Sequence, residues 1–69
     1  MHTKFIEKIG KNVRRLRKQR GLTMADLAAK LNKDYQNLQR IELGTTNPTI
    51  IYLKEIADAL EVDICELFK

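Results

Sequence analysis

The chain has 69 residues, of which 43% are hydrophobic and 32% are charged, and its formal net charge is +4. This length allows a single domain, residues 1–69, with a small core, and the composition is that of a globular protein. No apolar run approaches the roughly 20 residues that span a bilayer, the first residues lack a signal-peptide pattern, and the single cysteine cannot form an intrachain disulfide. We therefore expect a cytoplasmic protein without membrane contact.

The charge is unevenly distributed along the chain. Residues 1–20 carry eight basic and one acidic side chain, a net charge of +7, whereas residues 45–69 carry two basic and five acidic side chains, a net charge of −3. Residues 21–44 are balanced. Such separation on a small domain creates an electrostatic dipole, which favours a polyanionic partner.

The first predicted element is an amphipathic helix from about Thr3 to Arg20. Apolar residues recur at spacings of four, four and three, which is the stripe of a half-buried helix: Phe5, Ile9, Val13 and Leu16. Gly10 lowers helix propensity or permits close packing. Arg17 adjoins the apolar stripe, so it would need an anionic partner if it is buried.

The next segment, 21–44, predicts two short helices joined by a tight bend. Thr23 and Asp26 fit a capping box, in which each side chain satisfies a free amide at the start of a helix over 23–31. Leu31 ends that helix.

The residues 32–34 (Asn-Lys-Asp) supply the bend. Asp34 is suited to cap a second helix over 34–43, and Gly44 is suited to stop it in a left-handed conformation.

The outer face of this second helix carries a chemical signal. Gln36 and Arg40 are four residues apart and project from one side, with Tyr35, Asn37 and Gln39 on the remaining surface. Amide and guanidinium groups form the paired hydrogen bonds that match adenine and guanine in the major groove. The pattern favours DNA readout, and the alternative is an ordinary solvated helix face.

The last third predicts two further helices. Thr49 can cap a helix whose inward residues are Leu53, Ile56, Ala57 and Leu60, with a contribution from Ile50. Asp63 and Glu66 fit a capping box for a short terminal helix through Phe68. The whole chain thus reads as five helices without a strand signal. The expected core consists of Val13, Leu16, Leu27, Leu31, Leu38, Ile41, Leu53, Ile56, Leu60 and Leu67.

An enzyme is not indicated. His2 lies near the terminus, Cys65 has no histidine base in its segment, and no metal-ligand spacing or phosphate-binding glycine loop occurs. We expect no catalytic residue, metal, cofactor or small-molecule ligand.

Many residues together resemble the Cro/phage-repressor-type helix-turn-helix family, also called xenobiotic-response-element regulators. The residues that carry the resemblance are Ile9-Gly10, Arg14, Leu16-Arg17, Gly21-Leu22-Thr23, Asp26-Leu27-Ala28, Leu31, Leu38, Arg40-Ile41-Glu42, Gly44, Asn47-Pro48, Leu53, Ile56-Ala57, Ala59-Leu60, Val62 and Glu66-Leu67-Phe68. The resemblance implies an all-α, compact five-helix, lambda-repressor-like DNA-binding domain with its helix-turn-helix at residues 23–43. It also implies a transcriptional regulator whose second motif helix enters the major groove of double-stranded DNA, usually as a homodimer on a palindrome.

The resemblance also assigns site residues by position. Those at base-contacting positions are Tyr35, Gln36 and Arg40, and the flanking Asn37 and Gln39 reach bases or the backbone. Those at phosphate-contacting positions are Thr23, Thr45, Thr46 and Asn47. Arg17 and Glu42 match a structural ion pair beneath the recognition helix.

The sequence departs from the family pattern at three places. Met24 stands where a glutamine commonly contacts a phosphate, and Tyr35 replaces a frequent glutamine. Residues 32–34 replace a common Gly-Val-Ser bend, with an asparagine that tolerates left-handed geometry.

A homodimer is expected through Ile51, Ile64 and Phe68. Ile51 should face away from the core, and Ile64 and Phe68 lie four apart on the terminal helix. A twofold partner would cover these apolar groups. The alternative is that Phe68 folds back onto the core.

Two other functions remain open at this stage. The same fold serves antitoxin-like and other protein-interaction modules, although the basic balance favours DNA. RNA binding would call for an exposed aromatic stacking surface, and Tyr35 is alone on the recognition helix.

Overall fold

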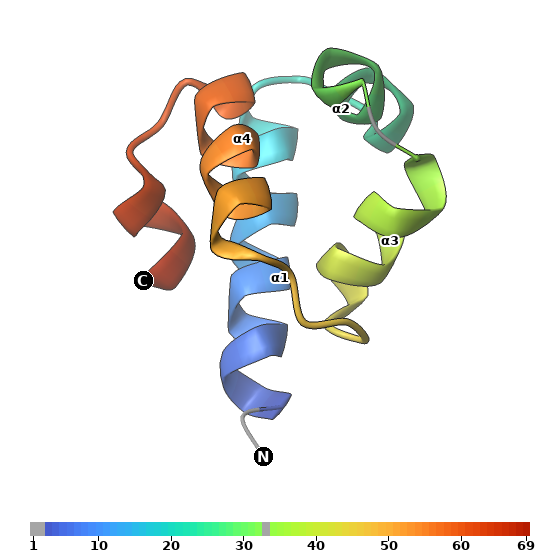
Figure 1. Cartoon of the computed structure of the whole chain (residues 1–69). Coiled ribbons are helices and arrows are strands. Elements are labelled where there is room, and N and C mark those ends of the chain that lie inside the picture. Colours follow the sequence, from blue (N-terminus) through green and yellow to red (C-terminus); the bar gives the residue numbers. More distant parts are fainter. Residues whose placement is uncertain (1–2, 33) are drawn as a thin grey trace.

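The computed structural model describes residues 3–32 and 34–69, and this part of the chain contains helices and loops but no strand. The α-helices are α1 (Thr3–Gln19), α2 (Met24–Leu31), α3 (Tyr35–Leu43) and α4 (Ile50–Leu60), followed by the 3-10 helix η1 (Ile64–Phe68). In Figure 1, α1 runs through the length of the molecule, with α3 to its right, η1 to its left and α2 across the top. The predicted order of five helical segments is confirmed. The predictions for His2, near the terminus, and for Lys33, in the bend, concern residues outside the described part of the chain.

The core is built from apolar side chains of all five helical segments. The largest fully buried side chains are Leu27, Leu38, Ile41, Ile56, Leu60, Leu67 and Val13. Every predicted core residue is buried except Leu31, which is only partly buried. Leu31 is the last residue of α2, so its side chain packs at the edge of the core.

Two predicted inward residues are wrong because they lie beyond the packed part of the bundle. Phe5 is 50% exposed, since the first turns of α1 extend past the other helices, as Figure 1 shows. Ile50 is 61% exposed, because it begins α4 at an open end, where it lines an apolar groove together with Phe5 and Phe68. Correct helix phase alone does not bury a residue at the end of a helix.

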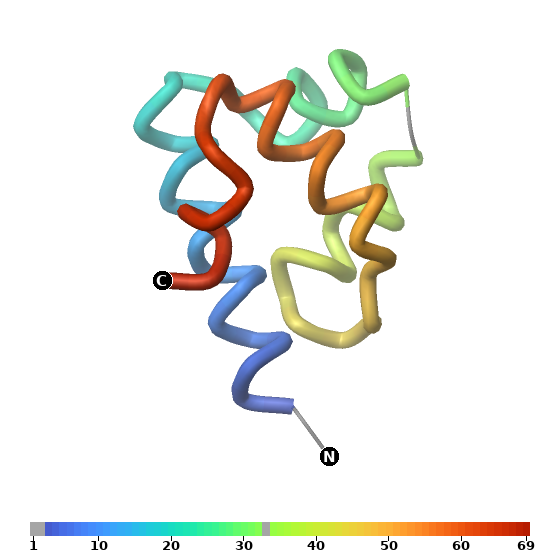
Figure 2. Tube along the Cα trace, turned by 60° about the vertical axis from the view of Figure 1, so that its left-hand side comes forward, coloured from blue at the N-terminus to red at the C-terminus, as the bar shows by residue number. Residues whose placement is uncertain are grey.

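The cap of the last helix also differs from the expected capping box. Asp63 accepts a hydrogen bond from the backbone N–H of Cys65 at 3.0 Å, but the carboxylate of Glu66 pairs with the Lys69 ammonium at 2.6 Å instead of reaching back to Asp63. The terminal helix is 3-10 rather than α-helical. The side-chain amide of Asn12 donates to the Leu67 carbonyl at 2.9 Å, which holds η1 beside α1 (Figure 2).

Candidate nucleic-acid interface

The first helix of the predicted motif begins as expected. The Thr23 hydroxyl oxygen accepts from the Asp26 N–H at 3.0 Å, and the Asp26 carboxylate accepts from the Thr23 N–H at 2.9 Å. The hydrogen bonds that the Asp26 carboxylate accepts from Thr23, first from its backbone N–H and then from its side chain, hold the pKa of Asp26 below its usual value. The helix ends at Asn32, which adopts the left-handed conformation with φ of 53°. Both ends of α2 are therefore set by local chemistry.

The second helix of the motif, α3, also has both predicted caps. Asp34 accepts from the Gln36 N–H at 3.1 Å. Gly44 is left-handed with φ of 74°, and its N–H bonds back to the Arg40 and Ile41 carbonyls. The Thr45 N–H also bonds the Arg40 carbonyl, at 3.0 Å, so the chain turns sharply away after Leu43.

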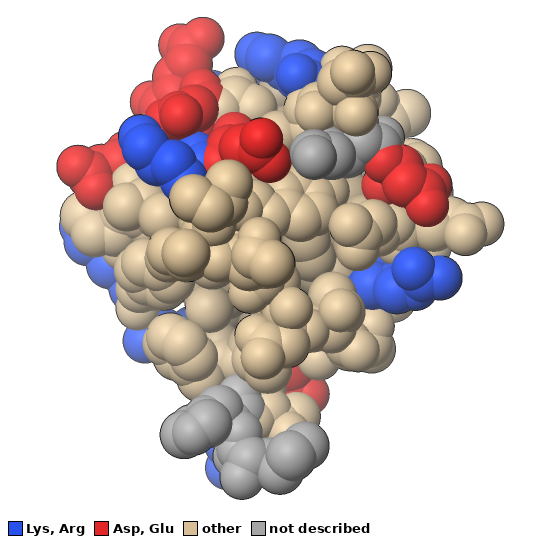
Figure 3. Space-filling view, in the orientation of Figure 1, with Lys and Arg blue, Asp and Glu red and all other residues tan. Residues whose placement is uncertain are grey.

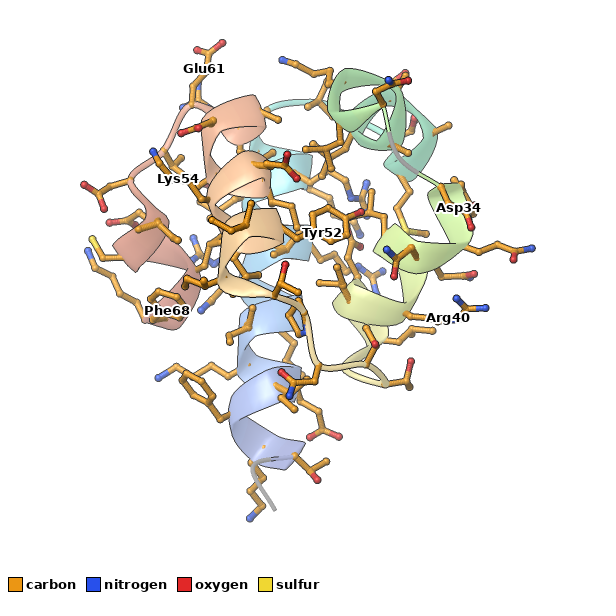
Figure 4. The ribbon with its side chains drawn as sticks, in the orientation of Figure 1. Asp34, Arg40, Tyr52, Lys54, Glu61 and Phe68 are labelled. Carbon is orange, nitrogen blue, oxygen red and sulfur yellow. The ribbon has the colours of Figure 1, made fainter. Side chains whose placement is uncertain are left out.

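The residues predicted to read bases lie on the outer side of α3. Gln36, Gln39 and Arg40 are exposed, Tyr35 is 43% exposed, and Asn37 is partly buried. In Figure 4 the side chain of Arg40 points away from α1 and α4. The inner side of the same helix buries Leu38 and Ile41 completely.

An ion pair fixes this inner side to α1, as the sequence predicts. The Arg17 guanidinium donates to the two carboxylate oxygens of Glu42 at 2.7 and 3.1 Å, and its third nitrogen donates to the Leu22 carbonyl at 2.8 Å. The two side chains are only 9% and 5% exposed. Because the guanidinium bonds both α3 and the segment before α2, one side chain sets the relative position of three helices.

Two glycines bring the backbone of α3 close to α1. A Cβ atom on Gly10 would lie 2.6 Å from the Glu42 carbonyl oxygen and even closer to that of Ile41. A Cβ atom on Gly44 would lie 2.8 and 2.9 Å from two carbons of Glu7. The sequence indicated the close-packing role of Gly10 only as one of two alternatives. With the ion pair, these contacts hold α3 rigidly while its outer side stays free.

The residues predicted to contact the DNA backbone lie before and after the two helices of the motif in the sequence. Thr23 precedes α2, and the other three follow α3, where Thr45 and Asn47 are exposed and Thr46 is partly buried. The Thr45 hydroxyl donates to the Arg40 carbonyl at 3.3 Å, whereas Asn47 lines the apolar groove beside Ile50. The structure thus leaves these four assignments as predictions.

The surface charge follows the separation seen in the sequence. In the view of Figure 3, acidic side chains gather at the upper left, over the end of α4 and the segment leading to η1. Glu61 and Lys54 lie in this region in Figure 4. Most basic residues of α1 are exposed. After this helix, the Arg20 guanidinium donates a hydrogen bond to the Glu61 carbonyl oxygen at 3.0 Å.

The three residues predicted at a dimer interface do not share one environment. Ile51 is 67% exposed, as expected for a residue facing away from the core. Ile64 and Phe68 are partly buried against the core, and the Phe68 ring stacks on Phe5 with centroids 6.2 Å apart and planes 16° apart. Phe68 therefore does fold back, which was the alternative left open by the sequence.

Sequence reasoning missed two features near the site. Tyr52 is buried at 9% exposure, and burial, followed by the charges of Glu55 and Asp34, raises the pKa of its phenol. Its spacing of four from Ile56 could have placed it on the inner side of α4. Leu43 was named only as the end of α3, yet it is 61% exposed.

The described residues contain no helix long and apolar enough to cross a membrane. Within the same residues, no group of three or more histidine, cysteine or acidic side chains is placed to hold a metal ion.

Comparison with known proteins identifies the family. A family model described as helix-turn-helix matches residues 13–67. The HTH-type transcriptional regulator y4dJ of Sinorhizobium fredii is 42% identical over 59 residues, which cover 86% of this chain and 77% of that protein. Among solved structures, the restriction-modification controller protein C.AhdI from Aeromonas hydrophila is 30% identical with a TM-score of 0.88, over 91% of this chain and 96% of that chain. The controller protein C.Esp1396I, solved as a tetramer with its natural 35 base-pair operator, is 32% identical with a TM-score of 0.81, over 94% and 96% of the two chains. The chain belongs to the helix-turn-helix family of transcriptional regulators.

Proposed function

We propose that this protein regulates transcription by binding double-stranded operator DNA, with α3 in the major groove. The observation that carries the proposal is the two-sided character of α3. Its inner side is fixed to α1 by the Arg17–Glu42 pair, whereas Gln36 and Arg40 project from its outer side. An amide and a guanidinium on a rigid helix can form paired hydrogen bonds with adenine and guanine edges. The proposal includes no catalytic step, and it places the protein in the cytoplasm with its DNA.

Backbone contacts come from the residues around α3 in this proposal. The Thr23 hydroxyl accepts a hydrogen bond within its capping box and also bonds the Asp26 carboxylate, so its proton must leave that carboxylate to reach a phosphate oxygen. Thr45, Thr46 and Asn47 follow α3 and give further donors, although the Thr45 hydroxyl must leave the Arg40 carbonyl to reach a phosphate. These contacts position the domain without carrying sequence information.

A homodimer completes the proposal. The relative C.Esp1396I is a tetramer on its operator, and Ile51 leaves 67% of its surface uncovered on α4. At the start of the same helix, an apolar groove of about 740 Å³ is lined in part by Phe5, Ile50 and Phe68. A second copy that covers these groups removes apolar area from water at about 25 cal/mol per Å². Twofold symmetry then places two α3 helices roughly 34 Å apart, one duplex turn.

The test is selection of bound duplexes from a random pool at a stated salt concentration. We expect a palindromic motif. Arg40→Ala should weaken binding by about 1–3 kcal/mol and relax the preference at one base pair per half-site. Thr46→Ala should weaken binding to all sequences alike. Arg15→Ala, which removes the same charge from the exposed side of α1, is the control and should leave the motif unchanged.

Two results would contradict the proposal. An unchanged motif with Arg40→Ala would show that α3 does not read bases in this way. Failure of the wild-type protein to select any duplex would favour a protein-interaction module with the same fold.

A further inference from the structure

An exposed leucine ends the outer side of α3. Leu43 is 61% exposed, while the buried side of the helix is formed by Leu38 and Ile41. Most of this side chain remains in water in the free protein, so it adds little to the stability of the fold. On the proposed DNA-binding surface it is free to contact a ligand.

The position of Leu43 aligns it with the predicted base-reading residues. Leu43 follows Gln36 by seven residues, nearly two helical turns, so the two side chains leave α3 within about 20° of each other. It lies one turn beyond Gln39 on the same side. Along the helix axis it is about 10 Å from Gln36, a separation of roughly three base-pair steps.

A small recess with a mixed lining lies beside Leu43. Leu43, Gln39 and Met24, the first residue of α2, line this recess of about 160 Å³, which Arg14 also borders. The remaining lining comes from Arg17 and Glu42, whose charged groups are bonded to each other at the inner side of α3. The apolar surface of the recess is therefore supplied by Leu43 and by the thioether of Met24.

Only one apolar group is presented by base edges in the major groove, and it is the C5 methyl group of thymine. We propose that Leu43, with Met24 beside it, reads the C5 methyl group of one thymine in each half-site. This inference rests on the proposed function, because it requires α3 to lie in the major groove. It adds a specificity-determining residue to the hydrogen-bonding residues Gln36 and Arg40.

The experiment replaces single thymines of the selected duplex by deoxyuridine, which removes the methyl group and keeps the hydrogen-bonding edge. Binding of each duplex is measured with the wild-type protein, with Leu43→Ala and with Gln19→Ala. Gln19 is exposed at the end of α1 and has no part in the proposed DNA or dimer contacts, so it is the control.

With the wild-type protein, we expect one deoxyuridine position per half-site to weaken binding about fourfold, the effect of burying one methyl group. With Leu43→Ala, this position should bind thymine and uracil equally, whereas Gln19→Ala should keep the fourfold difference. The inference is overturned if the selected motif has no thymine preference, if no thymine position responds to deoxyuridine, or if the response persists in Leu43→Ala. Selection of no motif at all would instead remove the proposed function and this inference together.

Discussion

Replacing Gly10 with alanine adds one methyl group that has two opposing effects. In a helix interior, alanine is about 1 kcal/mol more favourable than glycine, so helix propensity alone predicts a more stable protein. The structure predicts the opposite. The added Cβ would lie 2.6 Å from the Glu42 carbonyl oxygen and 2.9 Å from its carbonyl carbon, whereas ordinary contact begins near 3.4 Å.

The neighbours of this methyl group cannot rotate aside, because they belong to the backbone of α3. The helix must move by at least the difference between 3.4 and 2.6 Å, 0.8 Å, because the Ile41 carbonyl oxygen lies closer still, and that movement strains the adjacent ion pair. Overpacking of this kind costs about 1–3 kcal/mol, and we expect the upper value here because no side chain can relieve it. After the gain in helix propensity, the net loss for Gly10→Ala should be about 2 kcal/mol.

Equilibrium urea denaturation measures this loss directly. Lys11→Gly and Lys11→Ala provide the control, because Lys11 is exposed on the same helix and the pair gives the propensity difference without a packing effect. A Gly10→Ala protein as stable as the wild type, or more stable, would refute the close approach of α1 and α3.

Three further predictions follow from contacts described above. Glu42→Gln removes the charge opposite the buried Arg17 and should lower the free energy of unfolding by roughly 3–5 kcal/mol, a large part of what a small domain has; an unchanged denaturation midpoint would show that the pair contributes nothing. Because the pKa of Asp26 is lowered on folding, its carboxylate adds stability above the unfolded pKa of about 3.9, and this stability is lost as the pH falls through the lower folded value. Asp26→Asn should therefore flatten the acid side of the curve of unfolding free energy against pH. A curve identical to that of the wild type would contradict the capping box. Ile51→Glu should shift the protein toward monomer in sedimentation over a wide concentration range, and a wild-type protein that is monomeric at high concentration would contradict the dimer.

The helix boundaries were predictable because they depend on neighbouring residues. Thr23, Asp34 and Gly44 act through hydrogen bonds within one turn, and all three have the predicted role. The same reasoning was right for Asp63 but wrong for Glu66, because Glu66 has a second local partner in Lys69 that the capping pattern does not include.

Features that depend on how helices meet were harder to predict. Helical periodicity gives the phase of a residue but not the extent of the neighbouring helix, so Phe5 and Ile50 were predicted to face inward although they are 50% and 61% exposed. The Phe5–Phe68 stacking joins the two ends of the chain, and no local pattern indicates it. For the candidate site, periodicity correctly placed Gln36 and Arg40 on the surface, while the contacts assigned to them stay predictions.

The fixed and the free sides of α3 have a consequence for the evolution of specificity. A helix of nine residues is too short to be stable alone, so α3 depends on its buried residues and on Glu42. The outward positions contribute little to that stability, because surface substitutions usually change it by less than about 0.5 kcal/mol. In the proposed mode of binding, lineages carrying this fold can therefore exchange residues at positions 36, 39, 40 and 43 and acquire new operators without first acquiring compensating changes in the core.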